Sequence, residues 1–182
     1  MDPEDSVIIR VATEDDKQYA KAITDEMESS AKIRGTGIAK RSPESIIQKM
    51  REGKGVIALT HSGKWAGFSY IETWSNGEFV SNSGLIVDPA YRGQGIARAI
   101  KEKIFELSRE KYPSAKIFSI TTGLAIMKLN ASLGFETVTY SEITGDQQFW
   151  QGCKSCVNFN ILQSKCCGNC LCTAMLFTPK VG

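Results

Sequence analysis

The sequence has a single histidine, and its first 152 residues contain no cysteine, because all six cysteines lie between Cys153 and Cys172. The histidine, His61, falls in a predicted hairpin turn, where side chains are usually solvated, so it is not a candidate catalytic base. The uneven distribution of cysteine is the clearest change of composition along the chain. It sets a short segment near the C-terminus apart from the rest.

Long apolar runs and strong charge of one sign are also missing. No run approaches the roughly 20 apolar residues that span a bilayer, and the acidic start "MDPEDSVIIR" has no apolar signal core. The formal net charge of +2 is too small to indicate binding to nucleic acid or to an anionic membrane surface. We therefore expect a cytoplasmic protein with no nucleic-acid partner and no membrane partner, in a compartment where disulfides are disfavoured.

The composition that is present is that of an ordinary globular protein. The chain has 182 residues, of which 42% are hydrophobic and 23% are charged, and it shows no internal repeat. This length and composition predict one domain over residues 1–182, in which the cysteine-rich segment lies at about 146–172, before the last strand.

Helical patterns begin at recognisable caps. Thr13 starts a capping box, and Ser42 followed by Pro43 is typical of a helix N-terminus. Between these two helices, the glycines and basic residues of "AKIRGTGIAKR" predict a loop. A third helix starts at Gly95 and leaves Lys101 off its apolar stripe; the stripe consists of Ile96, Ile100, Ile104 and Leu107.

Apolar and β-branched runs predict about seven strands, at 6–13, 55–60, 65–74, 77–87, 115–122, 135–143 and 173–179. Antiparallel neighbours come first, and helical crossovers appear in the second half of the chain. This order favours a mixed α/β fold, with a central mixed sheet and helices on both faces.

A short glycine segment, Arg92-Gly93-Gln94-Gly95, stands between a predicted strand and the third helix. The start of a helix exposes backbone N–H groups and carries about half a positive charge, and glycines let a ligand approach the backbone. The segment therefore predicts a phosphate or pyrophosphate cradle to which Arg92 adds a cation; the alternative is a plain turn. No Gly-Lys-Ser/Thr is present, and the preceding antiparallel strands do not fit a dinucleotide-binding fold.

Arg92-x-x-Gly95-x-Ala97 resembles the R/Q-x-x-G-x-G/A signature of the GNAT acyltransferase superfamily. The preceding "LIVDPAYRG" is similar to that family's fourth strand and turn, and "LNASLGF" falls where the family has a helix ending in Gly-Phe. The inferred order of elements is also similar, with the cysteine segment as an apparent insertion. The resemblance implies a mostly antiparallel sheet of about seven strands.

The same resemblance implies an acyl-CoA cofactor, usually acetyl-CoA, and an N-acyltransferase that transfers the acyl group to an amine by direct attack in a ternary complex. The cofactor's pyrophosphate would lie on the backbone amides that start the helix, its pantetheine arm would pair with the preceding strand, and an N–H near Val87 would polarise the acyl carbonyl. The cofactor-binding residues implied are Leu85, Ile86, Val87, Arg92, Gly93, Gln94, Gly95, Ile96, Ala97 and Asn130.

The general acid is uncertain, because Asn130 occupies the position where many members have a catalytic tyrosine. An amide cannot transfer a proton. The thiolate leaves without an acid, or Tyr140 or Tyr70 serves instead; the alternative is a non-catalytic acyl-CoA-binding protein whose cysteine segment is an interaction or zinc module. Asn130 itself is either a cofactor contact or a polar residue on the exposed face of a short helix.

Glu72 is the candidate general base, acting through water, and Glu78 is the other carboxylate considered; either would otherwise be a surface glutamate. The acceptor is a small-molecule or peptide amine, and a homodimer is compatible with the resemblance. Four basic residues between the first two helices either recognise an acidic acceptor or form a solvated loop; they are Lys32, Arg34, Lys40 and Arg41.

The cysteine segment contains Cys153-x-x-Cys156 and, ten residues later, Cys167-x-x-Cys170. Two such pairs resemble a small zinc ribbon, in which four thiolates bind a structural Zn²⁺. Reduced thiols that pack in the core are the main alternative, and a redox pair is another. The zinc ligands would be four of Cys153, Cys156, Cys167, Cys170 and Cys172.

Overall fold

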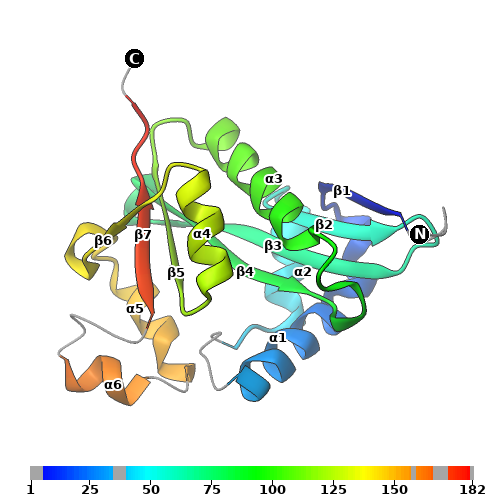
Figure 1. Ribbon diagram of the computed structural model, residues 1–182, viewed down its shortest axis with the longest axis horizontal. Coiled ribbons are helices and arrows are strands. Elements are labelled where there is room, and N and C mark those ends of the chain that lie inside the picture. Colours follow the sequence, from blue (N-terminus) through cyan, green and yellow to red (C-terminus); the bar gives the residue numbers. More distant parts are fainter. Residues whose placement is uncertain (1–5, 35–39, 157–158, 166–171, 181–182) are drawn as a thin grey trace.

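A computed structural model describes residues 6–34, 40–156, 159–165 and 172–180. Its centre is a seven-stranded sheet in the order β1-β2-β3-β4-β5-β7-β6 (Figure 1). Only β4 and β5 are parallel, and all other neighbours are antiparallel. The predicted mixed α/β fold is confirmed. The strands are β1 Val7–Val11, β2 Gly55–Thr60, β3 Trp65–Trp74, β4 Phe79–Val87, β5 Lys116–Thr121, β6 Glu136–Val138 and β7 Thr173–Phe177.

Helices cover both faces of the sheet (Figure 1). Alternate residues of one strand face opposite layers: Ile57 packs with α1 and α2, whereas Val56 packs with α3. The helices are α1 Ala20–Arg34, α2 Pro43–Arg51, α3 Ile96–Lys111, α4 Leu124–Ser132, α5 Gln147–Gly152 and α6 Phe159–Ser164.

The predicted helix starts are confirmed. The Asp16 carboxylate accepts a hydrogen bond of 2.8 Å from the Thr13 N–H, and a 3₁₀ turn over Glu14–Tyr19 leads into α1. The Ser42 hydroxyl accepts from the Ser45 N–H at 3.2 Å at the start of α2. Both caps satisfy N–H groups that have no partner inside the helix.

Three local predictions are wrong. Helix α1 continues to Arg34, so the first four residues of the predicted loop are helical, with Lys32 paired to Glu28 one turn earlier at 3.2 Å. Strand β6 ends at Val138, because the next residue, Thr139, is the N-cap of a 3₁₀ turn. Its backbone N–H donates to the Glu142 carboxylate. Lys101, predicted on the outer face of α3, is fully buried against the sheet.

The segment that precedes β7 is helical where it is described. Helices α5 and α6 extend the layer of α1 and α2 over β5 and β7, on a cluster that contains Phe118, Leu162 and Ala174. Phe149 of α5 meets Phe118 edge to face, with 5.0 Å between ring centroids. This cluster is separate from the one under α1 and α2.

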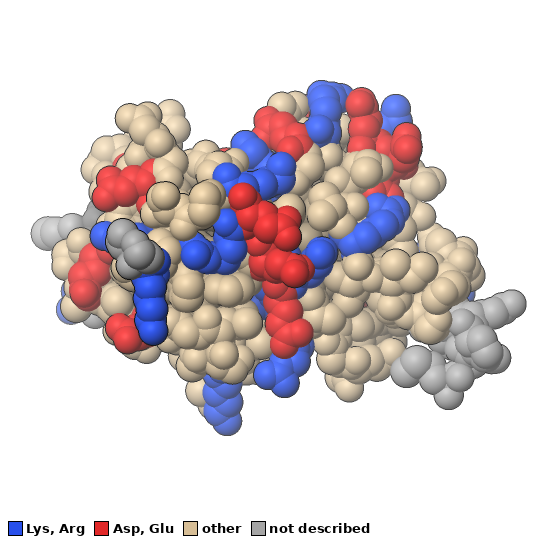
Figure 2. Space-filling model, turned by 90° about the horizontal axis from the view of Figure 1, so that it is seen from above, with Lys and Arg blue, Asp and Glu red and all other residues tan. Residues whose placement is uncertain are grey.

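The surface carries mixed charge. Figure 2 shows acidic and basic side chains interspersed on the face seen from above, with no broad area of one sign. Among the described residues, no helix combines the length and apolarity that a membrane crossing requires.

Candidate active site

The parallel strands β4 and β5 separate in the middle of the sheet. They pair only from Phe79 to Ser81 on β4 and from Lys116 to Phe118 on β5. Beyond Ser81, β4 stays paired with β3, while β5 pairs with β7. The edge of β4 from Asn82 to Val87 that faces β5 therefore has no strand partner among the described residues, and its backbone groups are available to a ligand.

A bulge bends β4 within this open stretch. The register with β3 shifts between Phe68 and Tyr70, opposite Gly84, which has φ +64°. A Cβ on Gly84 would lie 2.6 Å from Tyr70 Cε1 and 2.9 Å from Met27 Cε, so only glycine fits. Sequence reasoning missed this bulge, although a lone glycine inside the run "SNSGLIV" is its usual signal.

A cleft of about 500 Å³ opens beside the start of α3. Gly93 and Gly95 have φ of +77° and +78°, and Gly95 is the N-cap of α3. Among the described residues other than the chain neighbours, no heavy atom lies within 4 Å of a Cβ built on either glycine, so a ligand can reach this backbone. Twelve residues line the cleft: Val87, Tyr91, Arg92, Gly93, Gly95, Ile96, Ala97, Arg98, Ala125, Ile126, Lys128 and Leu129.

The Arg92 side chain, predicted to supply a cation to a phosphate, is paired with groups of the protein itself. Its Nη2 lies 2.8 Å from Glu26 Oε1 and 2.9 Å from Ser30 Oγ, both on α1, and its Nε donates to the Val87 carbonyl at 3.0 Å. Arg98 and Lys128 line the cleft together with Arg92. Sequence reasoning missed both, because Arg98 lies just beyond the motif and Lys128 comes from another helix.

Asn130 is completely buried on the inner side of α4, so the prediction of an exposed polar residue is wrong. Its Nδ2 lies 3.8 Å from Met175 Sδ, a weak contact. Its Oδ1 accepts no hydrogen bond from any described residue. An unsatisfied buried oxygen next to Leu129, which lines the cleft, suits a residue that completes its contacts with a ligand.

Tyr140 is not placed to act on a ligand in the cleft. Its hydroxyl donates to the Cys172 carbonyl at 2.8 Å, and its ring packs beside Trp150 in the cluster under α5 and α6. Glu78 is exposed at the start of β4, at the other end of the strand from Val87. Tyr140 instead lines a small cavity with Cys153, Cys156 and Cys172.

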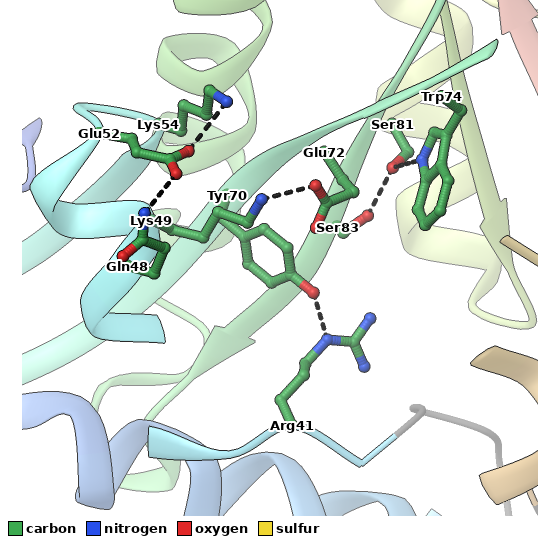
Figure 3. Close-up of polar contacts among 10 residues, drawn as sticks. All are labelled: Arg41, Gln48, Lys49, Glu52, Lys54, Tyr70, Glu72, Trp74, Ser81 and Ser83. Carbon is green, nitrogen blue, oxygen red and sulfur yellow. Dashed lines mark hydrogen bonds and ion pairs between the residues drawn. The ribbon is translucent and has the colours of Figure 1, made fainter. Parts of the chain in front are cut away.

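A second pocket, of about 300 Å³, lies on the opposite face of the sheet, beside α2. Here the structure brings together Glu72 and Tyr70, two of the sequence candidates (Figure 3). Glu72 Oε1 lies 2.6 Å from Lys49 Nζ, and the Tyr70 hydroxyl oxygen accepts from Arg41 Nε. The lining residues are Lys40, Arg41, Ser42, Ser45, Lys49, Tyr70 and Glu72.

The two pockets are on opposite sides of the same opening in the sheet. Tyr70 pairs with Ser83 across the strands, and Glu72 pairs with Ser81, which is the last residue of β4 before it leaves β5. Val87, farther along β4, lines the cleft on the α3 side. A ligand that reaches through the opening would bring its end to the pocket beside α2.

The described cysteines do not form a metal site. Cys153, Cys156 and Cys172 line a small cavity of about 40 Å³ whose other walls are mostly apolar. Among the residues with described placement, no three His, Cys, Asp or Glu side chains are arranged to hold a metal ion. Cys167 and Cys170 lie outside the described residues, so the zinc ribbon stays a prediction.

Comparison with known proteins agrees with this arrangement. The family model described as "Acetyltransferase (GNAT) domain" matches residues 20–147. No curated protein matches the sequence.

Solved structures share the fold at low sequence identity. Rv2747 from Mycobacterium tuberculosis, in complex with CoA and NLQ, has a TM-score of 0.66 at 19% identity, over 95% of this chain and 99% of that one. N-acetylglutamate synthase from Neisseria gonorrhoeae, complexed with coenzyme A and N-acetyl-glutamate, has a TM-score of 0.66 at 16% identity, over 97% of this chain but only 36% of the synthase.

The ribosomal-protein-S18-alanine N-acetyltransferase from Escherichia coli has a TM-score of 0.59 at 17% identity, over 97% of both chains. The fold is therefore shared with acetyltransferases, and the family model covers more than half of the sequence. The chain belongs to the GNAT acetyltransferase family.

Proposed function

We propose that this protein transfers the acetyl group of acetyl-CoA to a primary amine, by direct attack within a ternary complex. The observation that carries the proposal is the opening between β4 and β5, beside a helix N-terminus whose two glycines leave the backbone accessible. A phosphate-bearing donor fits this start of α3, and an extended arm fits the unpaired edge of β4.

The donor would be held by the backbone more than by side chains. The N–H groups from Gly93 to Ala97 would bind the pyrophosphate, and Arg98 and Lys128 would add positive charge. The edge formed by Leu85, Ile86 and Val87 would pair with the pantetheine arm, and an N–H of this edge would polarise the acetyl carbonyl. The buried Oδ1 of Asn130 would complete its hydrogen bonding on the same ligand.

The chain's own residues would mainly position the amine. Acetyl-CoA supplies the acetyl group and a thiolate leaving group, and a thiol pKa near 8.5 makes departure without a strong acid feasible. The amine nitrogen forms the new C–N bond while the C–S bond breaks. Glu72 would accept the amine proton through water, and the Tyr70 hydroxyl, which lines the same pocket, is the candidate proton donor to the sulfur.

The amine acceptor is supported by what the structural neighbours bind. One neighbour is complexed with coenzyme A and N-acetyl-glutamate, and another is named for the alanine of a ribosomal protein. The first ligand is the N-acetylated form of an amino acid, and the second name specifies a residue of a protein, so both are consistent with acetyl transfer to an amine.

The test of the donor site is Gly95→Asp, measured by calorimetric titration with CoA. The new carboxylate would face the pyrophosphate, so CoA affinity should fall by more than tenfold, or over ~1.4 kcal/mol. Gly77→Asp is the matched control, since Gly77 also has a positive φ of +85° and open space but lies in the β3–β4 connection. Equal affinities of the two variants would contradict the proposed donor site.

The rival function is acyl-CoA binding without turnover. Release of thiol from acetyl-CoA, followed across a panel of amines, separates the two functions. We expect release that depends on the acceptor. Tight CoA binding with no acceptor-dependent release from any amine would instead support the binding protein.

A further inference from the structure

We infer that the acceptor is a free amino acid, whose carboxylate binds Arg41 while its amino group faces Glu72. This inference rests on the proposed function and names the substrate class of the same site. It is carried by the charges that meet in the 300 Å³ pocket beside α2.

The positive end of the pocket is built around Arg41. Its Nε donates to the Tyr70 hydroxyl, and its guanidinium lies 5.6 Å from the centroid of the Tyr70 ring. Figure 3 shows the guanidinium beyond that hydroxyl, with its other two nitrogens directed away from the ring. The planar fork of arginine suits a carboxylate, which it can bind through two parallel hydrogen bonds. Lys40 adds a second cation on the pocket wall, 3.5 Å from Glu28.

The negative end of the pocket is Glu72. Lys49 Nζ lies 2.6 Å from Glu72 Oε1 and 5.9 Å from the centroid of the Tyr70 ring, so it holds the carboxylate at one place on the wall. In Figure 3 the Tyr70 ring separates Arg41 from the Lys49–Glu72 pair. A cation and an anion on one wall, kept apart by a ring, complement a ligand that carries both an ammonium and a carboxylate.

The size of the pocket favours a small acceptor. A volume of about 300 Å³ is at the lower end of ligand pockets, which span roughly 300–1,000 Å³. The pocket wall also includes the hydroxyls of Ser42 and Ser45. A polyamine would meet three cations and one carboxylate here, which disfavours it by charge.

The test compares L-amino acids with the α-amides of the same amino acids, by thiol release from acetyl-CoA. The amide keeps the amine and the side chain but lacks the carboxylate. The amine of the amide loses its proton more readily than the amine of the acid, so chemical reactivity alone favours the amide. A preference for the acid therefore shows that its carboxylate is bound. We expect kcat/KM at least tenfold higher for the best acid than for its amide.

Arg41→Gln should remove this preference. We expect KM for the acid to rise at least tenfold and kcat/KM for the acid to fall at least tenfold more than that for the amide, so that the ratio of the two approaches one. Arg51→Gln is the matched control, because Arg51 lies on α2 but pairs with Glu14 outside the pocket. CoA affinity reports folding, since the donor cleft lies on the other face, and it should be unchanged in both variants.

Several outcomes would overturn the inference. The inference would be overturned if the wild type used acids and amides equally. It would also be overturned if the Arg41→Gln variant slowed both substrates alike. Preference for O-phosphoethanolamine over every amino acid would assign the cation to a phosphate, and preference for peptide amines would assign the pocket to a polypeptide. If no acceptor releases thiol, the proposed function fails; binding of acids and amides to the CoA-bound protein then decides this inference separately.

Discussion

At the scale of single residues, the burial of Asn130 has opposite effects on the stability of the protein and on ligand binding. Its side chain is fully enclosed, and its Oδ1 is one of two buried side-chain polar atoms without a hydrogen-bond partner among the described residues. Such an atom costs stability in the unliganded protein. The same atom gives a bound molecule something to satisfy.

Replacing Asn130 by leucine should therefore stabilise the protein and impair the reaction. The variant removes the unsatisfied oxygen at similar volume, so we expect the free energy of unfolding in urea to rise by about 1 kcal/mol, while acetyl-CoA turnover falls. Asn82→Leu is the matched control. Its amide donates to Ser108 Oγ at 2.7 Å, so its loss leaves a partner unpaired and should destabilise the protein.

Single residues also show how far sequence could predict the site. Gly93 and Gly95 were identifiable because backbone conformation at a helix start is a local property, and a motif records it. The role of Arg92 was not, because its partners Glu26 and Ser30 lie on α1, more than 60 residues earlier. The pocket formed by Arg41, Tyr70 and Glu72 likewise requires contacts between distant segments.

At the scale of elements, α3 buries Lys101 against the sheet. Lys101 Nζ lies 3.4 Å from Asn82 Oδ1 and 5.0 Å from the centroid of the Phe135 ring, and burial lowers the pKa of Lys101 to about 7. Between pH 7 and about pH 10, the unfolded chain keeps the Lys101 proton while the folded protein does not. Stability therefore rises with pH across this range, and the contribution is flat below it.

Lys101→Met should expose this dependence. We expect the variant's advantage in unfolding free energy over the wild type to shrink by roughly 2 kcal/mol between pH 7 and pH 9. Chemical denaturation at each pH measures it. Lys103→Met, which changes an exposed lysine of the same helix, should show a constant difference from the wild type over that range. A constant difference for Lys101→Met as well would contradict the assignment.

Most elements could be predicted because their signals are local. Periods of two and of about four residues placed all seven strands and the first four helices near their observed positions. The separation of β4 from β5 could not be predicted in this way, because it depends on which strand each edge pairs with. The burial of Lys101 could not be predicted either. The helical pattern places this residue beside the apolar stripe but does not show how wide the contact of α3 with the sheet is.

At the scale of the whole molecule, the helices of both faces share one sheet, so a ligand that binds the folded chain should stabilise all of it. CoA at 100 times its Kd contributes about 3 kcal/mol by mass action, which for a chain of this size raises Tm by roughly 5–11 °C. Differential scanning fluorimetry measures the shift. Gly77→Asp should keep the shift, whereas Gly95→Asp, with an affinity at least tenfold lower, should lose about half of it or more at the same CoA concentration.

The sheet is also a partition between two entrances. The cleft beside α3 and the pocket beside α2 open on opposite faces, on either side of the place where β4 and β5 part. Two reactants can then bind and dissociate from opposite faces of the sheet, and neither blocks the dissociation of the other. A single inhibitor that joined a donor part to an acceptor part would have to pass between β4 and β5. It should therefore associate slowly and dissociate more slowly still.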